Sequence, residues 1–498
     1  MRHWIMIPLL LPLLAGMANL LLVRRGPGPQ RLVSLLATAA LLPVAILLLL
    51  RADVGEIIVY QLGDWPAPFG ISLVLDRLSA MLLVLTASLA LPALGAAIAG
   101  DDLRGQNFHV LFPLQLFGIN GAFLTGDLFN LFVFFEVMLI ASYGLALHGG
   151  GRDRVRAGLQ YVVLNLIGSS LFLVAIGALY GIAGTLNMAD LAVYASSAVV
   201  EQTPLLRIAA LLLFTVFALK AAVLPLHLWL PALYSAGTAP VAALFAIMTK
   251  VGVYAILRTF TLILPVNGAG SDVSAVLPAV AMLTIAAGAL GALGARRLTV
   301  LIAYLVVVSV GTLLAGISLF TVSGLTAALF YLPHTTLVTA GLFLLAALIA
   351  GRRGAAGDLL QPVASQPGYL LGGLFFLAAI AVAGMPPLAG FLGKLMLLQA
   401  APPGKFAWLG PVVLVASLAC LVALSRAGSS LFWRTEGEAA GVTGFSLRLT
   451  APTVLLLAMT VALTVWAAPV CRYAEATAAQ LLHPREAVEA VLGREVRR

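Results

Sequence analysis

Residues 212–231 read LLFTVFALKAAVLPLHLWLP, an apolar run that holds one lysine, Lys220, and an internal proline, Pro225. A helix needs about 20 predominantly apolar residues to cross a bilayer. Proline lacks the backbone N–H that continues a helix. The stretch therefore predicts a membrane-spanning helix that breaks at Pro225, with a charged side chain beside the break.

A second break, further along the chain, has the opposite order. Residues 383–397 read AGMPPLAGFLGKLML, so the prolines, Pro386 and Pro387, precede the lysine, Lys394. Broken helices at corresponding positions of two halves indicate inverted repeats around a transport site at mid-membrane. We therefore expect two inverted five-helix repeats, each with a broken helix.

The composition supports a chain that lies mostly in lipid. Of its 498 residues, 62% are hydrophobic and 9% are charged, and the mean hydropathy is +1.09. A soluble domain has about a quarter of charged residues, so a soluble or disordered protein is excluded. We predict an all-α polytopic membrane protein with about fourteen spans, which cover residues 3–23, 31–50, 77–99, 107–125, 127–147, 157–183, 205–229, 239–264, 275–294, 298–319, 324–349, 368–399, 406–426 and 449–468.

Outside the spans, two short segments have patterns of their own. EIIVYQL and FGISLVL flank GDWPAP within residues 56–75, which predicts a small extramembrane β-hairpin. In the tail, Leu481, Leu482, Val488, Val491 and Leu492 recur at helical spacing among charges, which predicts either an interfacial or partner-facing amphipathic helix or a solvated end. The expected domains are a three-helix segment with the hairpin, two repeats with proton half-channels, and the last span with its tail, over residues 1–106, 107–264, 275–433 and 434–498.

Arginine is distributed unevenly between the two sides of these spans. If the amino terminus lies outside, the inside loops hold fourteen arginines, and the outside loops and helix ends hold six basic residues with five more arginines in the tail. This fits the positive-inside rule and predicts a multi-pass protein of the cell inner (plasma) membrane with both termini outside. The net charge of +9 then belongs to loops beside the lipid bilayer, and we expect no nucleic-acid partner.

Four ionisable residues fall inside apolar segments. Glu136 lies near the middle of its span, and Lys220, Lys250 and Lys394 are three of only four lysines in the chain. A lone charge at the bilayer centre costs several kcal/mol, so such residues pair, become neutral or line a wet cavity. One interpretation is a static ion pair of Glu136 with Lys220, with the other lysines reaching to the surface. The other is a lateral proton relay, because a buried lysine can release its proton whereas arginine cannot.

Two histidines lie in or beside the helical core. His334, in FYLPHTTLV, is a candidate for the relay because it could join the two halves and its ordinary pKa of about 6.5 suits proton exchange. His227, beside the Pro225 break, is either a relay member or a packing residue. Cys420 and Cys471 form no metal motif, and neither a nucleotide-binding loop nor a haem motif is present. We therefore expect no cofactor and no metal.

Four motifs together resemble a known family. GDLFNLFVFFEVMLIASYGL, ALKAAVLPLHLWLPALYSAGTAPVAALFAIMTKVGVYAILR, RRLTVLIAYLVVVSVGTLLAGI and GMPPLAGFLGK resemble the proton-translocating subunits shared by respiratory complex I and the Mrp (Mnh, Pha) antiporters. Within that family, the D-type member of the Mrp antiporter is the best match. GDWPAPFGISLVLDRLSAML and the chain length agree with it, and the resemblance runs from about residue 55 to 425.

The resemblance implies a relay along Glu136, Lys220, Lys250, His334 and Lys394, in a subunit of a multi-subunit Na+/H+ antiporter. Its implied partners are the other antiporter subunits, with protons and Na+ as the transported ions. Thr339 stands where some relatives carry a further lysine, and Ala232 stands where complex I relatives carry an acid. The alternative is a proton-pumping membrane-arm subunit of complex I or of a membrane-bound hydrogenase.

Overall fold

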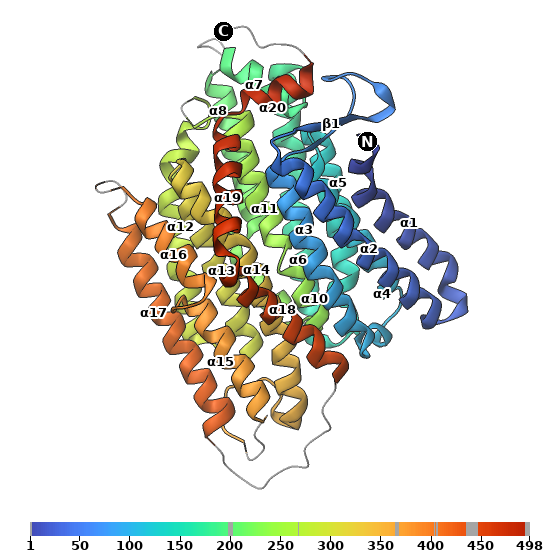
Figure 1. The fold of residues 1–498 in the computed structure, drawn as a ribbon, viewed down its shortest axis with the longest axis vertical. Helices are drawn as coiled ribbons and strands as arrows, with labels where there is room; N and C mark the ends of the chain where they lie inside the picture. The colour runs from blue at the N-terminus through green and yellow to red at the C-terminus, as the bar shows by residue number, and fades with distance from the viewer. Residues whose placement is uncertain are drawn as a thin grey trace.

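The computed structural model describes residues 2–197, 203–266, 268–363, 368–402, 404, 407–434 and 447–493. Lys405 and the last three tail arginines, Arg494, Arg497 and Arg498, are counted above with the outside charges, and they lie outside the described residues. Within them the chain is helical almost throughout, which confirms the predicted fold class (Figure 1). The α-helices are α1 (Ile7–Leu22), α2 (Pro27–Asp53), α3 (Arg77–Ile98), α4 (Phe108–Leu124), α5 (Leu128–Leu147), α6 (Arg152–Ala183), α7 (Met188–Ser197), α8 (Thr203–Ala221), α9 (Trp229–Ala236), α10 (Ala239–Phe245), α11 (Met248–Arg258), α12 (Ser271–Gly294), α13 (Leu298–Ile317), α14 (Val322–Arg352), α15 (Tyr369–Ala383), α16 (Ala389–Ala400), α17 (Leu409–Gly428), α18 (Leu447–Val465), α19 (Ala467–Leu482) and α20 (Arg485–Leu492).

The predicted spans correspond to helices of the structure. In the described part of the chain, 12 helical segments are long and apolar enough to cross a membrane. The shorter apolar helix α4 matches the predicted span 107–125, and the pair α15 and α16 matches 368–399. The largest difference at the start of a span concerns the one predicted at 157–183, since α6 begins at Arg152.

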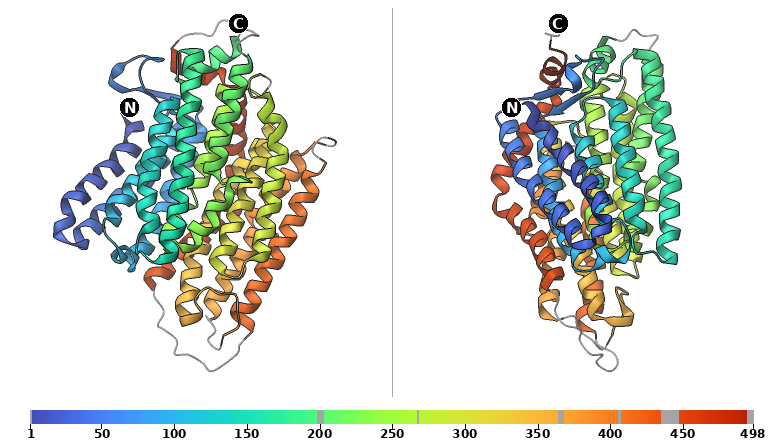
Figure 2. Two further views of the ribbon diagram at one scale, coloured as in Figure 1. Left: turned by 180° about the vertical axis from the view of Figure 1, so that it is seen from behind. Right: turned by 90° about the vertical axis from the view of Figure 1, so that its right-hand side faces the viewer.

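The spanning helices follow the chain across the bundle. Seen from behind, the colours pass from blue at α1 through green to orange at α17 (Figure 2). Consecutive helices therefore lie beside one another, and α18 with α19 returns across the opposite face to lie against α3 and α14. A row of residues that runs from α5 to α16 therefore crosses the bundle from side to side, and it does not follow the long axis.

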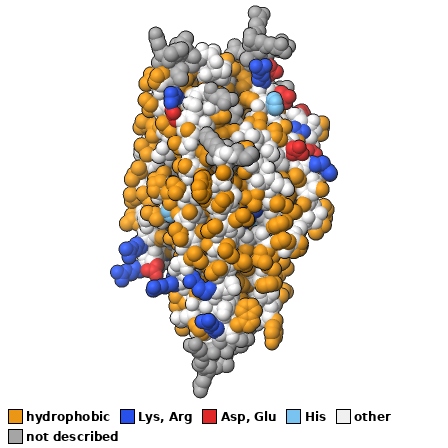
Figure 3. Space-filling model, turned by 90° about the vertical axis from the view of Figure 1, so that its left-hand side faces the viewer, with side chains coloured by type: hydrophobic (Ala, Val, Ile, Leu, Met, Phe, Trp, Pro, Cys, Tyr) orange, Lys and Arg blue, Asp and Glu red, His pale blue; other side chains and the backbone are white. Residues whose placement is uncertain are grey.

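One end of the bundle carries the predicted hairpin, and we call it the hairpin end. Strands β1 (Ile58–Gln61) and β2 (Ser72–Leu75) pair antiparallel, with Ile58 opposite Leu75. The first and last helices of the described chain, the 3-10 helix at Arg2–Met6 and α20, both contact β1 at this end. On the face shown in Figure 3, hydrophobic side chains cover the middle of the molecule and basic side chains gather toward the opposite end. We call that opposite end the arginine end.

Part of the tail packs on its own chain, which neither interpretation of its sequence included. The side chains of Leu481, Val488 and Val491 are buried, whereas those of Leu482 and Leu492 are partly exposed. Val488 and Val491 pack with Ala189 of α7 in a small apolar cluster at the hairpin end. These two valines therefore cover part of the first half of the molecule.

Both predicted helix breaks are present. The first separates α8 from the short 3-10 helix at Leu226–Leu228 and from α9. Here Trp229 Nε1 donates to the Leu219 carbonyl at 3.0 Å, and the Leu224 N–H donates to Thr284 Oγ1 at 3.1 Å. The second break separates α15 from α16, and Gly384 leaves the helix there with a φ of 79°. The freed backbone groups of such breaks need partners inside the protein.

Candidate functional site

Glu136 lies on α5, and its carboxylate faces α6. The cap of α5 is Asp127, whose side chain accepts the Asn130 N–H at 2.8 Å. Further along the helix, Glu136 is half-buried, and its Oε1 accepts a hydrogen bond from the Ser169 hydroxyl. The predicted mid-membrane acid is therefore tied to a serine that sequence reasoning had not singled out.

Lys220, near the end of α8, contacts the same serine. Its Nζ lies 3.3 Å from Ser169 Oγ, 3.3 Å from Asn165 Oδ1 and 3.5 Å from the Asn165 carbonyl, and its side chain is buried. Among the described residues, no carboxylate comes within ion-pair distance of this lysine. The direct Glu136–Lys220 ion pair expected from the sequence is thus replaced by a bridge through Ser169.

A hydroxyl suits this bridging position. It has one donor and two acceptor lone pairs, so Ser169 can accept from the Lys220 ammonium while it donates to the Glu136 carboxylate. The three groups then form a continuous hydrogen-bonded line between α5 and α8. Asn165 and Ser169 are four residues apart on α6, and this polar pair inside an apolar helix is the signal that could have identified them.

Lys250, on α11, is the most deeply buried of the three lysines that the structure describes. Its exposed fraction is 0%, and its Nζ lies 3.4 Å from Ser309 Oγ of α13. The backbones of α11 and α8 touch beside it, because a Cβ at Gly252 would lie 2.5 Å from the Ala221 nitrogen. Glycine at 252 therefore brings the helix that carries Lys250 against the end of the helix that carries Lys220.

His334 lies in the interior of α14, fully enclosed. Its Nε2 faces the Ala381 carbonyl of α15 at 3.2 Å. Its Nδ1 has no hydrogen-bond partner among the described residues. A Cβ at Gly390 would lie 2.0 Å from the Ala381 oxygen and 2.6 Å from His334 Nε2, so α16 can pass here only because residue 390 is glycine.

Lys394 binds the end of the broken helix. Its Nζ donates to the Val382 carbonyl at 3.1 Å, to the Ala383 carbonyl at 2.9 Å and to Ser417 Oγ at 2.9 Å. The carboxyl end of a helix carries partial negative charge, and an ammonium has three donors. The ammonium of Lys394 thus has an acceptor for each of its three N–H groups. At Lys250, Nζ has one long contact among the described residues.

The second break joins two of the predicted relay residues. His334 and Lys394 together contact the consecutive carbonyls of residues 381, 382 and 383. At the first break, His227 is buried and its Nδ1 has no partner in the described part of the chain. The structure therefore places His334 beside Lys394 but gives His227 no contact with a relay residue that it describes.

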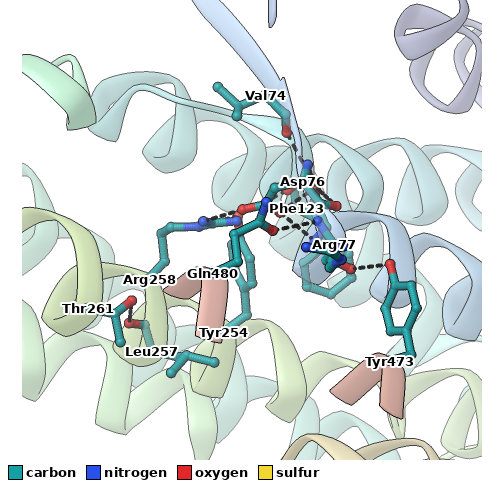
Figure 4. Close-up of polar contacts among 11 residues, drawn as sticks. Val74, Asp76, Arg77, Phe123, Tyr254, Leu257, Arg258, Thr261, Tyr473 and Gln480 are labelled. Atoms are coloured by element: carbon teal, nitrogen blue, oxygen red, sulfur yellow. Dashed lines mark hydrogen bonds and ion pairs between the residues drawn. The ribbon is translucent and has the colours of Figure 1, made fainter. Parts of the chain in front are cut away.

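A buried ion pair at the hairpin end was not predicted. Arg258, counted from the sequence as a helix-end charge, is buried, and its Nη1 lies 2.6 Å from Asp76 Oδ2 (Figure 4). Asp76 also caps α3, because its side chain accepts the Ser79 N–H at 2.9 Å. Arg258 Nε donates to the Tyr254 hydroxyl at 3.3 Å, and that hydroxyl donates to the Phe123 carbonyl at 3.0 Å.

The ionisation of Asp76 follows from this environment. Burial by itself would raise the pKa of Asp76, but the charge and hydrogen bond of Arg258 and the hydrogen bonds of Ser79 hold that pKa below its ordinary value. Asp76 is thus a buried carboxylate that is committed to Arg258. Within the described residues, no group of three or more His, Cys, Asp or Glu side chains is placed to hold a metal ion.

Comparison with known proteins assigns the chain to a family. The family model described as NADH:quinone oxidoreductase/Mrp antiporter, transmembrane, matches residues 125–421. This chain belongs to that family. The matched residues include both predicted breaks and all five predicted relay positions.

Named relatives match the chain over nearly its whole length. The D component of a probable K+/H+ antiporter of Rhizobium meliloti is 40% identical, with 98% of this chain and 97% of the relative covered. The D component of the Na+/H+ antiporter of Alkalihalophilus pseudofirmus is 37% identical, with 99% and 100% covered. A chain in the structure of the Mrp complex from Dietzia sp. DQ12-45-1b has a TM-score of 0.89 at 30% identity, with 99% and 100% covered.

Proposed function

We propose that this chain is the D-type, proton-translocating subunit of a multi-subunit monovalent cation/proton antiporter. It is a transporter subunit and not an enzyme, and its partners are the other subunits of that complex. One observation carries the proposal: three buried lysines bind neutral oxygen atoms and, within the described residues, no carboxylate. A lysine without a fixed counter-ion can exist as ammonium or amine, and this is what a relay requires.

In the first half, Ser169 is the proposed proton bridge. A proton leaves the Lys220 ammonium for Ser169 while the hydroxyl proton of Ser169 passes to Glu136. This transfer changes the charge on both ends of the bridge and leaves the serine unchanged. Lys250 then connects the first half to the second, because its helix touches that of Lys220 and its Nζ contacts Ser309 of α13.

In the second half, His334 and Lys394 meet at the end of α15. Their contacts to carbonyls 381–383 hold both side chains at the break formed by Pro386 and Pro387. The equivalent break, at Pro225, separates α8 from α9 in the first half. These paired breaks support the two predicted repeats, 107–264 and 275–433, as the units of transport.

The proposed orientation follows the charges. Basic loops favour the cytoplasmic side, so the arginine end would face the cytoplasm and the hairpin end the exterior of the plasma membrane. The alternative, a membrane-arm subunit of complex I or a hydrogenase, rests on the shared family description. The relatives named as antiporter subunits match over 97% or more of their length, which favours the antiporter.

The decisive experiment measures cation-driven proton exchange by the assembled complex. Inverted membrane vesicles with an imposed pH gradient receive Na+, K+ or choline, and the collapse of the gradient is followed by a fluorescent dye. We expect Na+ or K+, but not choline, to collapse the gradient in the wild type and neither to do so in Lys250→Ala. Normal exchange in an assembled Lys250→Ala complex would overturn the proposal.

A further inference from the structure

A cleft opens on the face where the tail crosses the bundle. Its volume is about 650 Å³, and α2, α3, α14, α18 and α19 all contribute to its walls. This volume lies in the range of small-molecule sites, which is about 300–1,000 Å³. The tail helix α19 contacts α14 and α3, and it lies on the side of the bundle that faces the viewer in Figure 1.

The walls are apolar and the mouth is charged. Along the cleft the lining is made by side chains such as Val84, Leu85, Leu337 and Leu463. At the hairpin end, Asp53 and Arg472 also line it, and both are exposed. A ligand that fits must therefore be long and apolar, with a head that carries a positive and a negative group.

The depth of the cleft distinguishes between two kinds of apolar occupant. Ser88 is the lining residue of α3 that is farthest from Arg77, the first residue of this helix, and it lies about 16 Å from Arg77 along the helix axis at 1.5 Å per residue. The hydrocarbon core is about 30 Å thick, so the cleft extends through one leaflet. A partner's transmembrane helix would need a groove across both leaflets, whereas the acyl chains of one lipid need only this depth.

We propose that this cleft binds a diacyl phospholipid whose zwitterionic head carries a phosphate and an amine. The acyl chains lie against α3 and α18, the phosphate faces Arg472, and the amine faces Asp53. The floor of the site includes Pro333 of α14, and the next residue is His334. The bound lipid thus fills the space beside the helix that carries His334 and keeps water out of it from this side.

The test is lipid retention by the purified multi-subunit complex, measured by mass spectrometry of extracted phospholipids after extensive detergent washing. The cleft variant is Leu463→Trp, which fills the space. The matched control is Leu418→Trp on α17, where the leucine is 60% exposed. We expect retained phosphatidylethanolamine to fall to the background level in Leu463→Trp and to stay at the wild-type level in Leu418→Trp.

A second variant tests the head group without changing the cleft walls. Arg472→Gln removes one charge near the membrane surface and should weaken retention of the lipid about fivefold. Retention equal to the wild type in both Leu463→Trp and Arg472→Gln would overturn the proposal. Efficient cross-linking of Ser88→Cys to another subunit would also overturn it, because a protein would then occupy the cleft.

Discussion

At the scale of single residues, Ser169 is the new member of the site. It stands between Glu136 and Lys220, so proton exchange between them has to pass through its hydroxyl. Ser169→Ala should lower the exchange rate about 10–100-fold, because a lost hydrogen bond to a charged group costs about 1.5–3 kcal/mol. Exchange in inverted vesicles, normalised to the amount of assembled complex, measures this.

The neighbouring serine provides a matched control for this prediction. Ser170 is exposed and bonds only to its own helix, at the Leu166 carbonyl. Ser170→Ala should leave exchange unchanged, and Ser169→Thr should restore most of it because it keeps the hydroxyl. Wild-type exchange in Ser169→Ala would show that protons bypass this bridge.

Replacement of the buried lysines by arginine tests proton release directly. A guanidinium keeps its proton up to about pH 12, so Lys250→Arg and Lys394→Arg should lose exchange almost as completely as the alanine variants. A site that needs only a positive charge would tolerate arginine. Full exchange in either arginine variant, at normal assembly, would assign that lysine a purely structural role.

The four ionisable residues inside spans could be predicted, because a charged residue inside an apolar run is visible in the sequence. Of the serines that bind these residues, only Ser169 left a local signal, through its spacing from Asn165 on α6. Ser309 and Ser417 look like ordinary helix residues, and they become partners only when helices from distant parts of the chain pack together. The same reason hid the Asp76–Arg258 pair, whose members are 182 residues apart.

At the scale of elements, the close approach of α16 to α14 and α15 depends on Gly390. A methyl group there would meet the Ala381 oxygen and His334 Nε2. Gly390→Ala should therefore displace His334 or α16, at a cost of about 1–3 kcal/mol for overpacking, and abolish exchange. Vesicle exchange and assembly level together test this expectation.

Gly373 on α15 is the control for that substitution, because a Cβ there would meet no atom within 4 Å. Gly373→Ala should assemble and exchange normally. If Gly390→Ala also exchanges at the wild-type rate, the packing beside His334 has no role in transport.

The ion pair at the start of α3 should contribute to stability in a pH-dependent way. Asp76→Asn leaves the Arg258 charge buried without its partner, which costs about 3–5 kcal/mol. The thermal unfolding midpoint of the purified complex should fall accordingly. Asp64→Asn, at an exposed residue of the hairpin loop, should leave it unchanged.

The sign of the pH effect follows from the lowered pKa of Asp76. The carboxylate stabilises the fold above its ordinary pKa of about 3.9, and this contribution disappears as the pH falls through the lowered folded value. The difference in midpoint between wild type and Asp76→Asn should thus stay constant from about pH 5 to 8 and narrow below about pH 4. A difference that grew on acidification would contradict the assignment.

Local signals predicted several elements well and others poorly. Both proline breaks and the hairpin are encoded by residues adjacent in the chain, and all are present in the structure. The packing of part of the tail was not predicted, because amphipathic spacing does not say which surface receives the apolar side. Here Val488 and Val491 pack on α7 of the same chain.

At the scale of the whole molecule, the proposed proton path leaves few carboxylates free to bind a cation among the described residues. Hard cations prefer oxygen ligands such as carboxylates. Glu136 is committed to the Ser169 bridge, and Asp76 is committed to Arg258. We therefore predict that this polypeptide alone shows no Na+/H+ or K+/H+ antiport.

Reconstitution of the purified single chain in liposomes tests this prediction. A pH gradient is imposed, and Na+ or K+ is added in parallel with the assembled complex as the positive control. The gradient should persist with the lone chain and collapse with the complex. Cation-dependent collapse by the lone chain would place the cation site within this polypeptide.

The contacts of Lys394 have a mechanical consequence. Of its three acceptors, the two backbone carbonyls can only receive a hydrogen bond, whereas the Ser417 hydroxyl can also give one. When the ammonium becomes an amine, its new lone pair needs a donor, and the hydroxyl can provide it by rotating about its own bond. In the proposed relay, the Ser417 hydroxyl therefore has two orientations, one for each charge state of Lys394.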